Sequence, residues 1–395
     1  MPTSAISKVC FVGAGTMGCF NALIAALSGY QVTLYDHNSD ALGRVHQRHN
    51  ELAGMLVAQG YCQAEDIPKA ILRVSLCSNL TEALFEVDLV SESVFERLDI
   101  KRDVHRQLDS LCSPQVIITT NSSVLLASDM ADVFEHRGRF AALHTHLGAP
   151  LVDIVATSAT TPDVVETLRA YVKSVGGVPL ILAKEHPGYV LNSMLGTVLR
   201  TAQTLYAVND IPIETIDRAW MMTRSAPMGP FGMMDLFGVD VVCDGRRNRR
   251  DELDLPAQKA AVLALLEPMV TAGHLGMKTG QGFYCYPNPA YQRAEFLTGN
   301  IDANVVHTLT TGLIASGVLV AARGVVEPAA VDLAWTVGTY LDTGPFALLA
   351  DMGQASFITA LKQEVASNRF SAEEAKELMH FLSETEASSL EKGTG

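Results

Sequence analysis

The segment that most constrains the fold is the glycine-rich sequence Gly13-Ala14-Gly15-Thr16-Met17-Gly18. It follows the short apolar run Val9–Val12 and precedes an alanine- and leucine-rich stretch that predicts a helix to about Ser28. A second strand is expected over residues 31–35, where the chain reaches Asp36. A strand, a crossover helix and a second strand form the βαβ unit of a parallel sheet.

Each glycine of this segment has a physical role in binding a dinucleotide. Gly13 permits a tight turn, Gly15 lets the backbone approach a pyrophosphate, and Gly18 lets the helix pack closely on the strand. Asp36, at the end of the second strand, can accept hydrogen bonds from the adenosine ribose and would repel a 2′-phosphate. We therefore predict a Rossmann-type domain that binds NAD; FAD, or a structural turn that binds nothing, are the alternatives. The predicted cofactor contacts here are Gly13, Gly15, Thr16, Met17, Gly18 and Asp36.

Further strands are expected in the first half of the chain, and helices dominate the second half. The predicted strands are residues 88–91, 116–119, 140–143 and 178–182, and residues 41–76 have the pattern of an inserted helical pair. From Pro187 onward long amphipathic helices replace the strand signals, so we place a domain boundary near Lys184. The fold class is therefore a mostly parallel α/β domain followed by an all-α half.

The helical half contains an internal repeat. Asp217-Arg218-Ala219-Trp220 recurs as Asp332-Leu333-Ala334-Trp335, and Met228-Gly229-Pro230-Phe231 recurs as Thr343-Gly344-Pro345-Phe346, both at an offset of 115 residues. Gly238 and Gly353 share this offset. We predict two tandem helical copies. The expected domains are residues 1–184 (NAD binding), 185–290 (first helical copy) and 291–395 (second helical copy).

The composition narrows the class of function. A formal net charge of −14 argues against nucleic acid as the main partner. No run of about eighteen uninterrupted apolar residues is present, and the N-terminus has no signal-peptide pattern, so no membrane segment is expected. Seven dispersed cysteines without a CxxC pair are typical of reduced thiols, which favours a cytoplasmic location.

Polar side chains that could transfer a proton follow two of the predicted strands. Ser122 lies just after one predicted strand and His144 follows the next, at the sheet edge where open α/β sheets bind ligands. Histidine suits proton exchange near neutral pH, and Asp153 is the nearest acidic partner that could orient it. His144 and His146 could also form half of a metal site, but no third ligand stands at a typical spacing, so no metal is predicted.

The sequence resembles the L-3-hydroxyacyl-CoA dehydrogenase family, and its motifs occur in the family's order from about residue 6 to 287. The tandem helical copies resemble the dehydrogenase portion of larger fatty-acid oxidation proteins. The motifs that carry the resemblance are Gly13–Gly18, Ser91–Glu96 with Lys101, Thr120–Ser123, Ala142–His144, His186–Asn192, Pro227–Phe231 and Lys278–Tyr284.

The resemblance implies NAD-dependent oxidation of the 3-hydroxyl of an L-3-hydroxyacyl-CoA, or the reverse reduction, in fatty acid metabolism. His144 would be the base, and Asp153 would take the place of the family's glutamate partner. Ser122 and Asn192 would hydrogen-bond the substrate oxygen. By the same resemblance, Glu96 and Lys101 would lie along the cofactor.

The chain departs from the family pattern near the predicted substrate site. Asp153 is one methylene shorter than the usual glutamate, and the segment between His144 and Asp153 is about three residues shorter than usual. Residues 41–61 contain Arg44 and Arg48 but no lysine, whereas the family often supplies a lysine to coenzyme A from this insert. A non-CoA hydroxy acid or an aromatic alcohol is therefore an alternative substrate.

Two other functions are compatible with the glycine-rich segment. The 6-phosphogluconate-type dehydrogenases share the glycine fingerprint but use a lysine four residues before an asparagine, where Gly188 precedes Asn192 here. A non-catalytic NADH-binding protein on the same fold is the other alternative. The presence of Ser122, His144 and Asn192 together argues against that second alternative.

The second helical copy lacks a counterpart of the residues 187–192 segment, so it is expected to carry no catalytic residue. Single-copy family members dimerise through the helical domain, and a second copy could cover that surface within one chain. We therefore expect truncation after Asn288 to expose an apolar face. The sequence leaves open whether the full chain is a homodimer.

Overall fold

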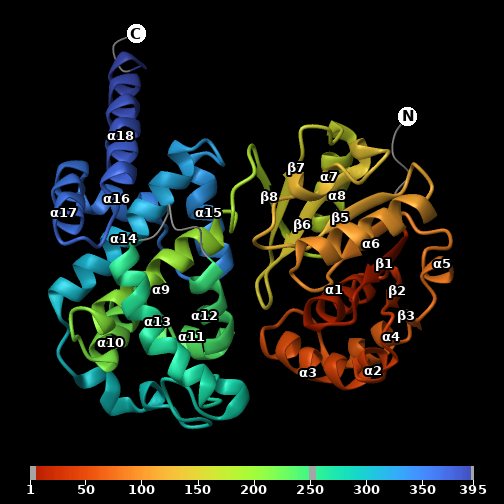
Figure 1. The fold of residues 1–395 in the computed structure, drawn as a ribbon, viewed down its shortest axis with the longest axis horizontal. Coiled ribbons are helices and arrows are strands. Elements are labelled where there is room, and N and C mark those ends of the chain that lie inside the picture. The colour runs from red at the N-terminus through yellow and green to blue at the C-terminus, as the bar shows by residue number, and fades with distance from the viewer. Residues whose placement is uncertain (1–5, 249–254, 393–395) are drawn as a thin grey trace. The chain divides into compact units, whose positions relative to one another are not determined.

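The computed structural model describes residues 6–248 and 255–392, and the chain forms two compact units (Figure 1). The first unit runs to Tyr189 and includes residues 337–339, and the second begins at Val190 and contains both helical copies. The sequence placed this change near Lys184, five residues earlier. That the two helical copies form separate domains stays a prediction.

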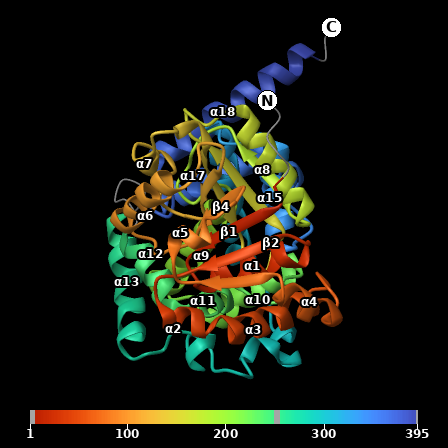
Figure 2. The same cartoon turned by 90° about the vertical axis from the view of Figure 1, so that its right-hand side faces the viewer.

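The first unit is built on an eight-stranded sheet in the order β3-β2-β1-β4-β5-β6-β7-β8. Every neighbouring pair is parallel except β6 and β7, which run antiparallel. Strands β2, β1 and β4 lie side by side in the second view as well (Figure 2). The mostly parallel α/β fold is thus confirmed. The strands are β1 Lys8–Val12, β2 Gln31–Tyr35, β3 Val74–Cys77, β4 Leu89–Glu92, β5 Ile117–Thr120, β6 Phe140–Thr145, β7 Leu151–Ala156 and β8 Val178–Leu182.

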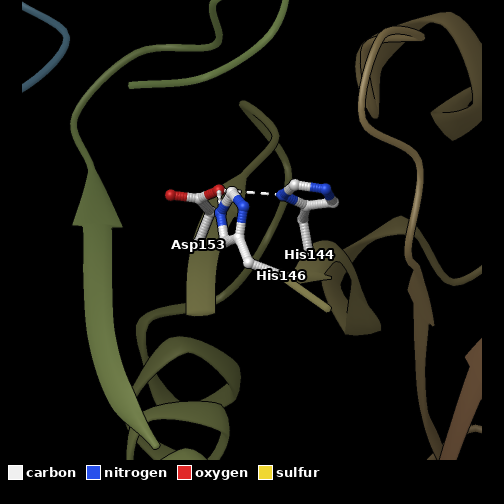
Figure 3. Close-up of side chains that lie close together, drawn as sticks. All are labelled: His144, His146 and Asp153. Carbon is white, nitrogen blue, oxygen red and sulfur yellow. Dashed lines mark hydrogen bonds and ion pairs between the residues drawn. The ribbon is translucent and has the colours of Figure 1, made fainter. Parts of the chain in front are cut away.

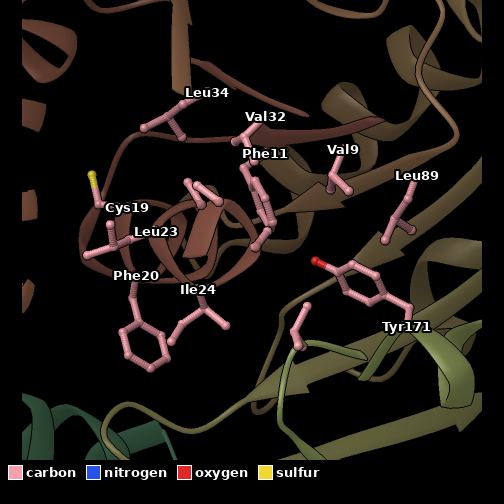
Figure 4. Packing of buried hydrophobic residues seen from close by; sticks show 14 of the residues in the cluster. Val9, Phe11, Cys19, Phe20, Leu23, Ile24, Val32, Leu34, Leu89 and Tyr171 are labelled. Carbon is pink, nitrogen blue, oxygen red and sulfur yellow. The ribbon is translucent and has the colours of Figure 1, made fainter. Parts of the chain in front are cut away.

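The core of this unit forms where α1 (Thr16–Leu27) packs on the first strands. Cys19, Phe20, Leu23 and Ile24 of α1 belong to the same buried cluster as Phe11 of β1 (Figure 4). Helices cover both faces of a parallel sheet, so its strands read as short apolar runs. The other helices of the unit are α2 Ser39–Gly43, α3 Val45–Ala58, α4 Ile67–Ile71, α5 Leu80–Ala83, α6 Leu98–Leu111, α7 Ser128–Ala131 and α8 Pro162–Ser174.

Two strands differ from the expectations based on sequence. Residues 74–76 were assigned to the inserted helical region, but they belong to the edge strand β3, so that assignment was wrong. An edge strand of four residues that is half exposed has no buried apolar run to reveal it. Strand β7 was not predicted, because its central residue is the charged Asp153. This second omission matters, because β7 carries part of the candidate site.

The second unit repeats one helical arrangement. Helices α10 and α11 recur as α15 and α16 at the same offset of 115 residues. Asp217 accepts hydrogen bonds from two backbone N–H groups at the start of α11, and Asp332 does the same at the start of α16. The repeated aspartates thus cap matching helices. The helices are α9 Leu191–Ala207, α10 Ile213–Arg224, α11 Pro230–Phe237, α12 Val239–Asn248, α13 Pro256–Thr271, α14 Ala303–Ala322, α15 Pro328–Thr339, α16 Pro345–Met352, α17 Gln354–Ala366 and α18 Ala372–Lys392.

Helix α14 is the centre of this unit. It packs on α9 and α10 of the first copy and on α16, α17 and α18 of the second. Its length and mean hydropathy of 1.7 would suit a membrane span, but 78% of that apolar window is buried inside the unit. Such burial is expected of a core helix that joins two packed layers.

Candidate active site

The glycine-rich loop has the shape that a dinucleotide requires. Gly13 has a φ of +107°, and a Cβ at this position would lie 2.7 Å from the carbonyl oxygen of Ser93. A Cβ at Gly18 would lie 1.8 Å from the carbonyl oxygen of Gly13. Gly15 is exposed, and its own added Cβ would meet no atom within 4 Å. Two glycines are therefore needed for the fold, and the third leaves open space where a ligand can approach.

The helix that follows this loop can bind an anion. Over Thr16–Leu27, α1 has no acidic residue in its first turn, and no side chain caps its N-terminus. Its first N–H groups and positive dipole end are therefore available to a pyrophosphate. Asp36 accepts a hydrogen bond from the N–H of Ala14 at 2.8 Å, so the acidic residue is tied to the loop. Arg48, which the sequence analysis assigned no role, donates to the carbonyl oxygen of Ala14 from α3.

A pair of substitutions separates the structural glycine from the ligand-facing one. We expect Gly18→Ala to lower the free energy of unfolding by about 1–3 kcal/mol or more, because the new methyl group overlaps the Gly13 carbonyl. We expect Gly15→Val to keep the stability of the parent but to raise the Kd for NADH roughly tenfold or more, about 1.4 kcal/mol. Urea unfolding and NADH fluorescence titration measure the two effects. Equal behaviour of the two variants in both assays would contradict this division of roles.

The sheet brings His144 and Asp153 together. The antiparallel pairing of β6 with β7 places the two residues directly opposite each other. Nδ1 of His144 lies 2.9 Å from Oδ2 of Asp153, and Nε2 of His146 lies 2.9 Å from the same oxygen (Figure 3). All three side chains are less than one tenth exposed. Alternate residues of a strand face the same side, which explains why His144 and His146 converge on one carboxylate.

The protonation of this group follows from burial and hydrogen bonding. Burial alone would raise the pKa of Asp153, but the hydrogen bonds from His144 and His146 outweigh it and hold the pKa below its usual value. Burial lowers the pKa of His144 and the neighbouring His146 lowers it further, against the opposing effect of Asp153. An ionised Asp153 can only accept hydrogen bonds, so Nδ1 of His144 carries its proton. The other ring nitrogen, Nε2, is then a free base at neutral pH.

Ser122 contacts Glu96, and Tyr189 links Ser122 to this histidine. The Ser122 hydroxyl donates to Oε1 of Glu96, and the N–H groups of Ser123 and Val124 point to the same oxygen at 3.2 Å. Tyr189 donates from its hydroxyl to the carbonyl oxygen of Ser122 at 3.0 Å. Its ring centroid lies 5.2 Å from that of His144. The tyrosine therefore connects the serine loop to the histidine.

Lys101 is held by a buried network of charges. Its Nζ lies 2.8 Å from Oε1 of Glu92 and 3.3 Å from Oε2 of Glu96. Nε2 of His105 lies 3.2 Å from the other oxygen of Glu92. Burial opposes ionisation of Glu92, but the contacts with His105 and Lys101 lower the pKa of Glu92 to about 2. Through Lys101, the network also holds the carboxylate of Glu96. The predicted cofactor contacts of Lys101 and Glu96 stay predictions.

Asn192 belongs to the second unit, where it is half-buried in the first turn of α9. Its predicted hydrogen bond to the substrate oxygen therefore stays a prediction.

The donor atoms of His144, His146 and Asp153 lie within 4.8 Å of one another, which is close enough for a divalent cation to bind. The sequence offered no third ligand at a typical spacing, because it did not place Asp153 on a strand that pairs with β6. The 2.9 Å separations are hydrogen-bond distances, and we interpret the cluster in those terms. The expectation of no metal stays a prediction.

The site contains contacts that the sequence did not indicate. His146 was considered only as half of a metal site, and the alternation of a strand, which puts residues 144 and 146 on one face, could have indicated its contact with Asp153. Glu92, His105 and Tyr189 have no spacing that marks them, since their roles depend on contacts between distant segments.

Comparison with known proteins identifies the family. Residues 8–186 match the family model described as the NAD binding domain of 3-hydroxyacyl-CoA dehydrogenase, and residues 188–286 match its C-terminal domain. The chain is 30% identical over 282 residues to a 3-hydroxybutyryl-CoA dehydrogenase of Clostridioides difficile, covering 71% of this chain and 99% of that protein.

Two solved structures are also similar. A diketoreductase, studied for its catalysis on dicarbonyl compounds, has a TM-score of 0.65 and 32% identity, and the match covers 72% of this chain and all of that one. A 3-hydroxybutyryl-CoA dehydrogenase of Escherichia coli has a TM-score of 0.77 at 21% identity, over 96% of this chain and 99% of that one. The latter likeness shows that the fold extends through both helical copies. The protein is thus an NAD-dependent oxidoreductase that acts on a CH–OH group, and it belongs to the 3-hydroxyacyl-CoA dehydrogenase family.

Proposed function

We propose that this protein oxidises the 3-hydroxyl of an L-3-hydroxyacyl-CoA with NAD, and reduces the 3-ketoacyl-CoA in the reverse direction. The observation that carries the proposal is the contact between Nδ1 of His144 and the carboxylate of Asp153. This contact fixes the tautomer that leaves Nε2 of His144 unprotonated. A buried imidazole in this state is a suitable base for a secondary alcohol.

Each residue of the candidate site has a separate proposed role in the reaction. When bound, NAD supplies the acceptor for the hydrogen and the two electrons that leave C3. His144 takes the hydroxyl proton at Nε2, and the negative charge of Asp153 stabilises the resulting imidazolium. Ser122 and Asn192 are proposed to donate hydrogen bonds to the oxygen as it becomes a carbonyl, Ser122 by turning its hydroxyl proton from Glu96 to the substrate. In the reverse direction His144 returns the proton to that oxygen.

A second candidate is a hydroxy acid or carbonyl compound without coenzyme A. Two observations favour it: Asp153 is shorter than the family's glutamate, and a relative at 32% identity is described as acting on dicarbonyl compounds. The short turn after His144 also contacts the helical insert, since Nε2 of Gln59 donates to the carbonyl oxygen of Gly148 at 3.2 Å. This turn and insert differ from the family pattern at the place where the bulk of a thioester ligand is expected.

A substrate panel distinguishes these candidates. Purified protein is mixed with NAD and short or long L-3-hydroxyacyl-CoAs, and separately with the same acids lacking coenzyme A, while NADH formation is followed. Turnover of the thioesters alone is expected under the first proposal, and turnover of the free acids alone would move the substrate to the second. NADH binding without any turnover would contradict both and would favour a non-catalytic NADH-binding protein.

A further inference from the structure

The carboxylate of Asp153 is bonded unevenly. Oδ2 receives hydrogen bonds from two imidazoles, while the buried Oδ1 has no hydrogen-bond partner among the residues that the structure describes. The side chain itself is fully buried. A carboxylate normally distributes its donors over both oxygens, so this arrangement concentrates all orienting contacts on one atom.

The position of His146 is set by the chain around it. It follows the last residue of β6, and its carbonyl oxygen accepts a hydrogen bond from the N–H of Ala149 at 3.2 Å. Gly148 in this turn has a φ of +77°. The tight turn begins at His146 and leads directly into β7. The shortened segment therefore fixes the backbone from which the second imidazole reaches Asp153.

We propose that His146 is a positioning residue, whose Nε2–H holds the Asp153 carboxylate so that Oδ2 faces Nδ1 of His144. This inference rests on the proposed role of His144 as the base. This chain has an aspartate in place of the family's longer glutamate, and a shorter loop before it. A second hydrogen-bond donor, His146, orients the carboxylate instead.

The effect follows from the freedom of an aspartate side chain. The torsion that turns the carboxylate is broad, so a single hydrogen bond from His144 leaves the group able to rotate. A second donor at 2.9 Å confines it. Loss of this donor would misplace Oδ2 and loosen the ring of His144, and misplacement by about 1 Å can cost roughly 100-fold in rate.

His146 also affects the proton affinity of His144. The groups that face His144 are Asp153, His146, Glu96 and the ring of Tyr189. Glu96 and Asp153 favour the imidazolium, whereas His146 opposes it and shares the charge of Oδ2. Removing the imidazole of His146 should therefore raise the pKa of His144. In the direction of alcohol oxidation, the acid limb of the pH profile should move to higher pH.

The test compares His146→Phe, which keeps a flat ring but removes the donor, with His146→Gln, which retains an N–H donor. We expect His146→Phe to lower kcat roughly 10–100-fold. The KM and the Kd for NADH should change by less than about twofold, and the acid limb should shift upward. His146→Gln should recover most of kcat. A wild-type kcat and pH profile in His146→Phe, with matching circular dichroism, would overturn the inference.

Two measurements on the unaltered protein complete the test. Nitrogen-15 NMR of the histidines should show His146 protonated at Nε2, and a His146 protonated only at Nδ1 would overturn the inference. Dialysis against EDTA should leave activity unchanged. Loss of activity that Zn²⁺ restores would also overturn it, because the same three donor atoms would then bind a cation.

The failure of the proposed function has a different signature. If His144→Ala retains wild-type activity in the same assay, the proposed role of His144 fails and the inference fails with it. If His144→Ala is inactive while His146→Phe is unchanged, only the role of His146 fails.

Discussion

Replacing His144 by alanine is expected to reduce kcat for alcohol oxidation roughly 10²–10⁴-fold, the range that a positioned general base contributes. The variant loses the Nε2 atom that we propose accepts the hydroxyl proton, and it leaves Asp153 hydrogen-bonded to His146 alone. Cofactor binding depends on the glycine-rich loop, so the Kd for NADH should stay within about twofold. Steady-state kinetics with fluorescence titration of NADH measures both quantities.

The pH dependence provides a second readout for His144. Because burial and His146 lower the pKa of His144, the neutral base persists to a pH below the ordinary imidazole value. Oxidation should therefore rise with pH through that low pKa and stay level at neutral pH. Reduction requires the imidazolium and should fall over the same range.

A matched control is His136→Ala, since His136 is exposed in the same unit and lies outside the candidate site. It should leave kcat, the pH profile and NADH binding as in the parent. Comparable losses in both histidine variants would show that the effect of His144→Ala is not that of a catalytic base.

Truncation after Asn288 is expected to give a protein that dimerises or aggregates at micromolar concentration. It removes α14, whose buried side chains pack on α9 and α10 of the first copy. It also removes Trp335, which meets the buried Trp220 edge to face with ring centroids 6.2 Å apart. The apolar side chains of α9 and α10 that pack on α14 lose that burial, each worth about 2 kcal/mol. The total approaches the whole stability of a typical domain.

Size-exclusion chromatography with light scattering tests this prediction. The control is a chain that ends at Thr385, which keeps α14–α17 and most of α18 and should behave as the full-length protein. An Asn288 truncation that is soluble, monomeric and active would show that the second copy does not cover an essential apolar face.

Residues of the candidate site that lie near one another in the sequence could be expected to lie close together in the fold. The glycine-rich loop and Asp36 belong to one βαβ unit, and His144 and Asp153 are nine residues apart on paired strands. Their proximity required only that two strand ends meet. Strand β7 itself was missed because a buried charge, the candidate site residue Asp153, interrupts its apolar pattern.

Contacts that depend on the packing of a helix against a strand could not be predicted in this way. Glu92 on β4 meets Lys101 and His105 on α6, and the motif of residues 91–96 with Lys101 does not indicate that these charges are buried together. The hydrogen bond from the Tyr189 hydroxyl to the carbonyl oxygen of Ser122 joins residues that are 67 positions apart in the sequence. Such contacts depend on how helices and strands pack, which single-residue patterns do not encode.

The antiparallel pairing of β6 and β7 makes the alignment of His144 with Asp153 independent of the length of the turn between the strands. The register of the sheet, rather than the length of the connecting turn, sets His144 opposite Asp153. Residues can therefore be gained or lost beyond His146 while His144 and Asp153 stay opposite each other. A change in the turn beyond His146 then alters the surroundings of the two side chains without moving either from its strand, which gives the scaffold a natural place to acquire new specificity.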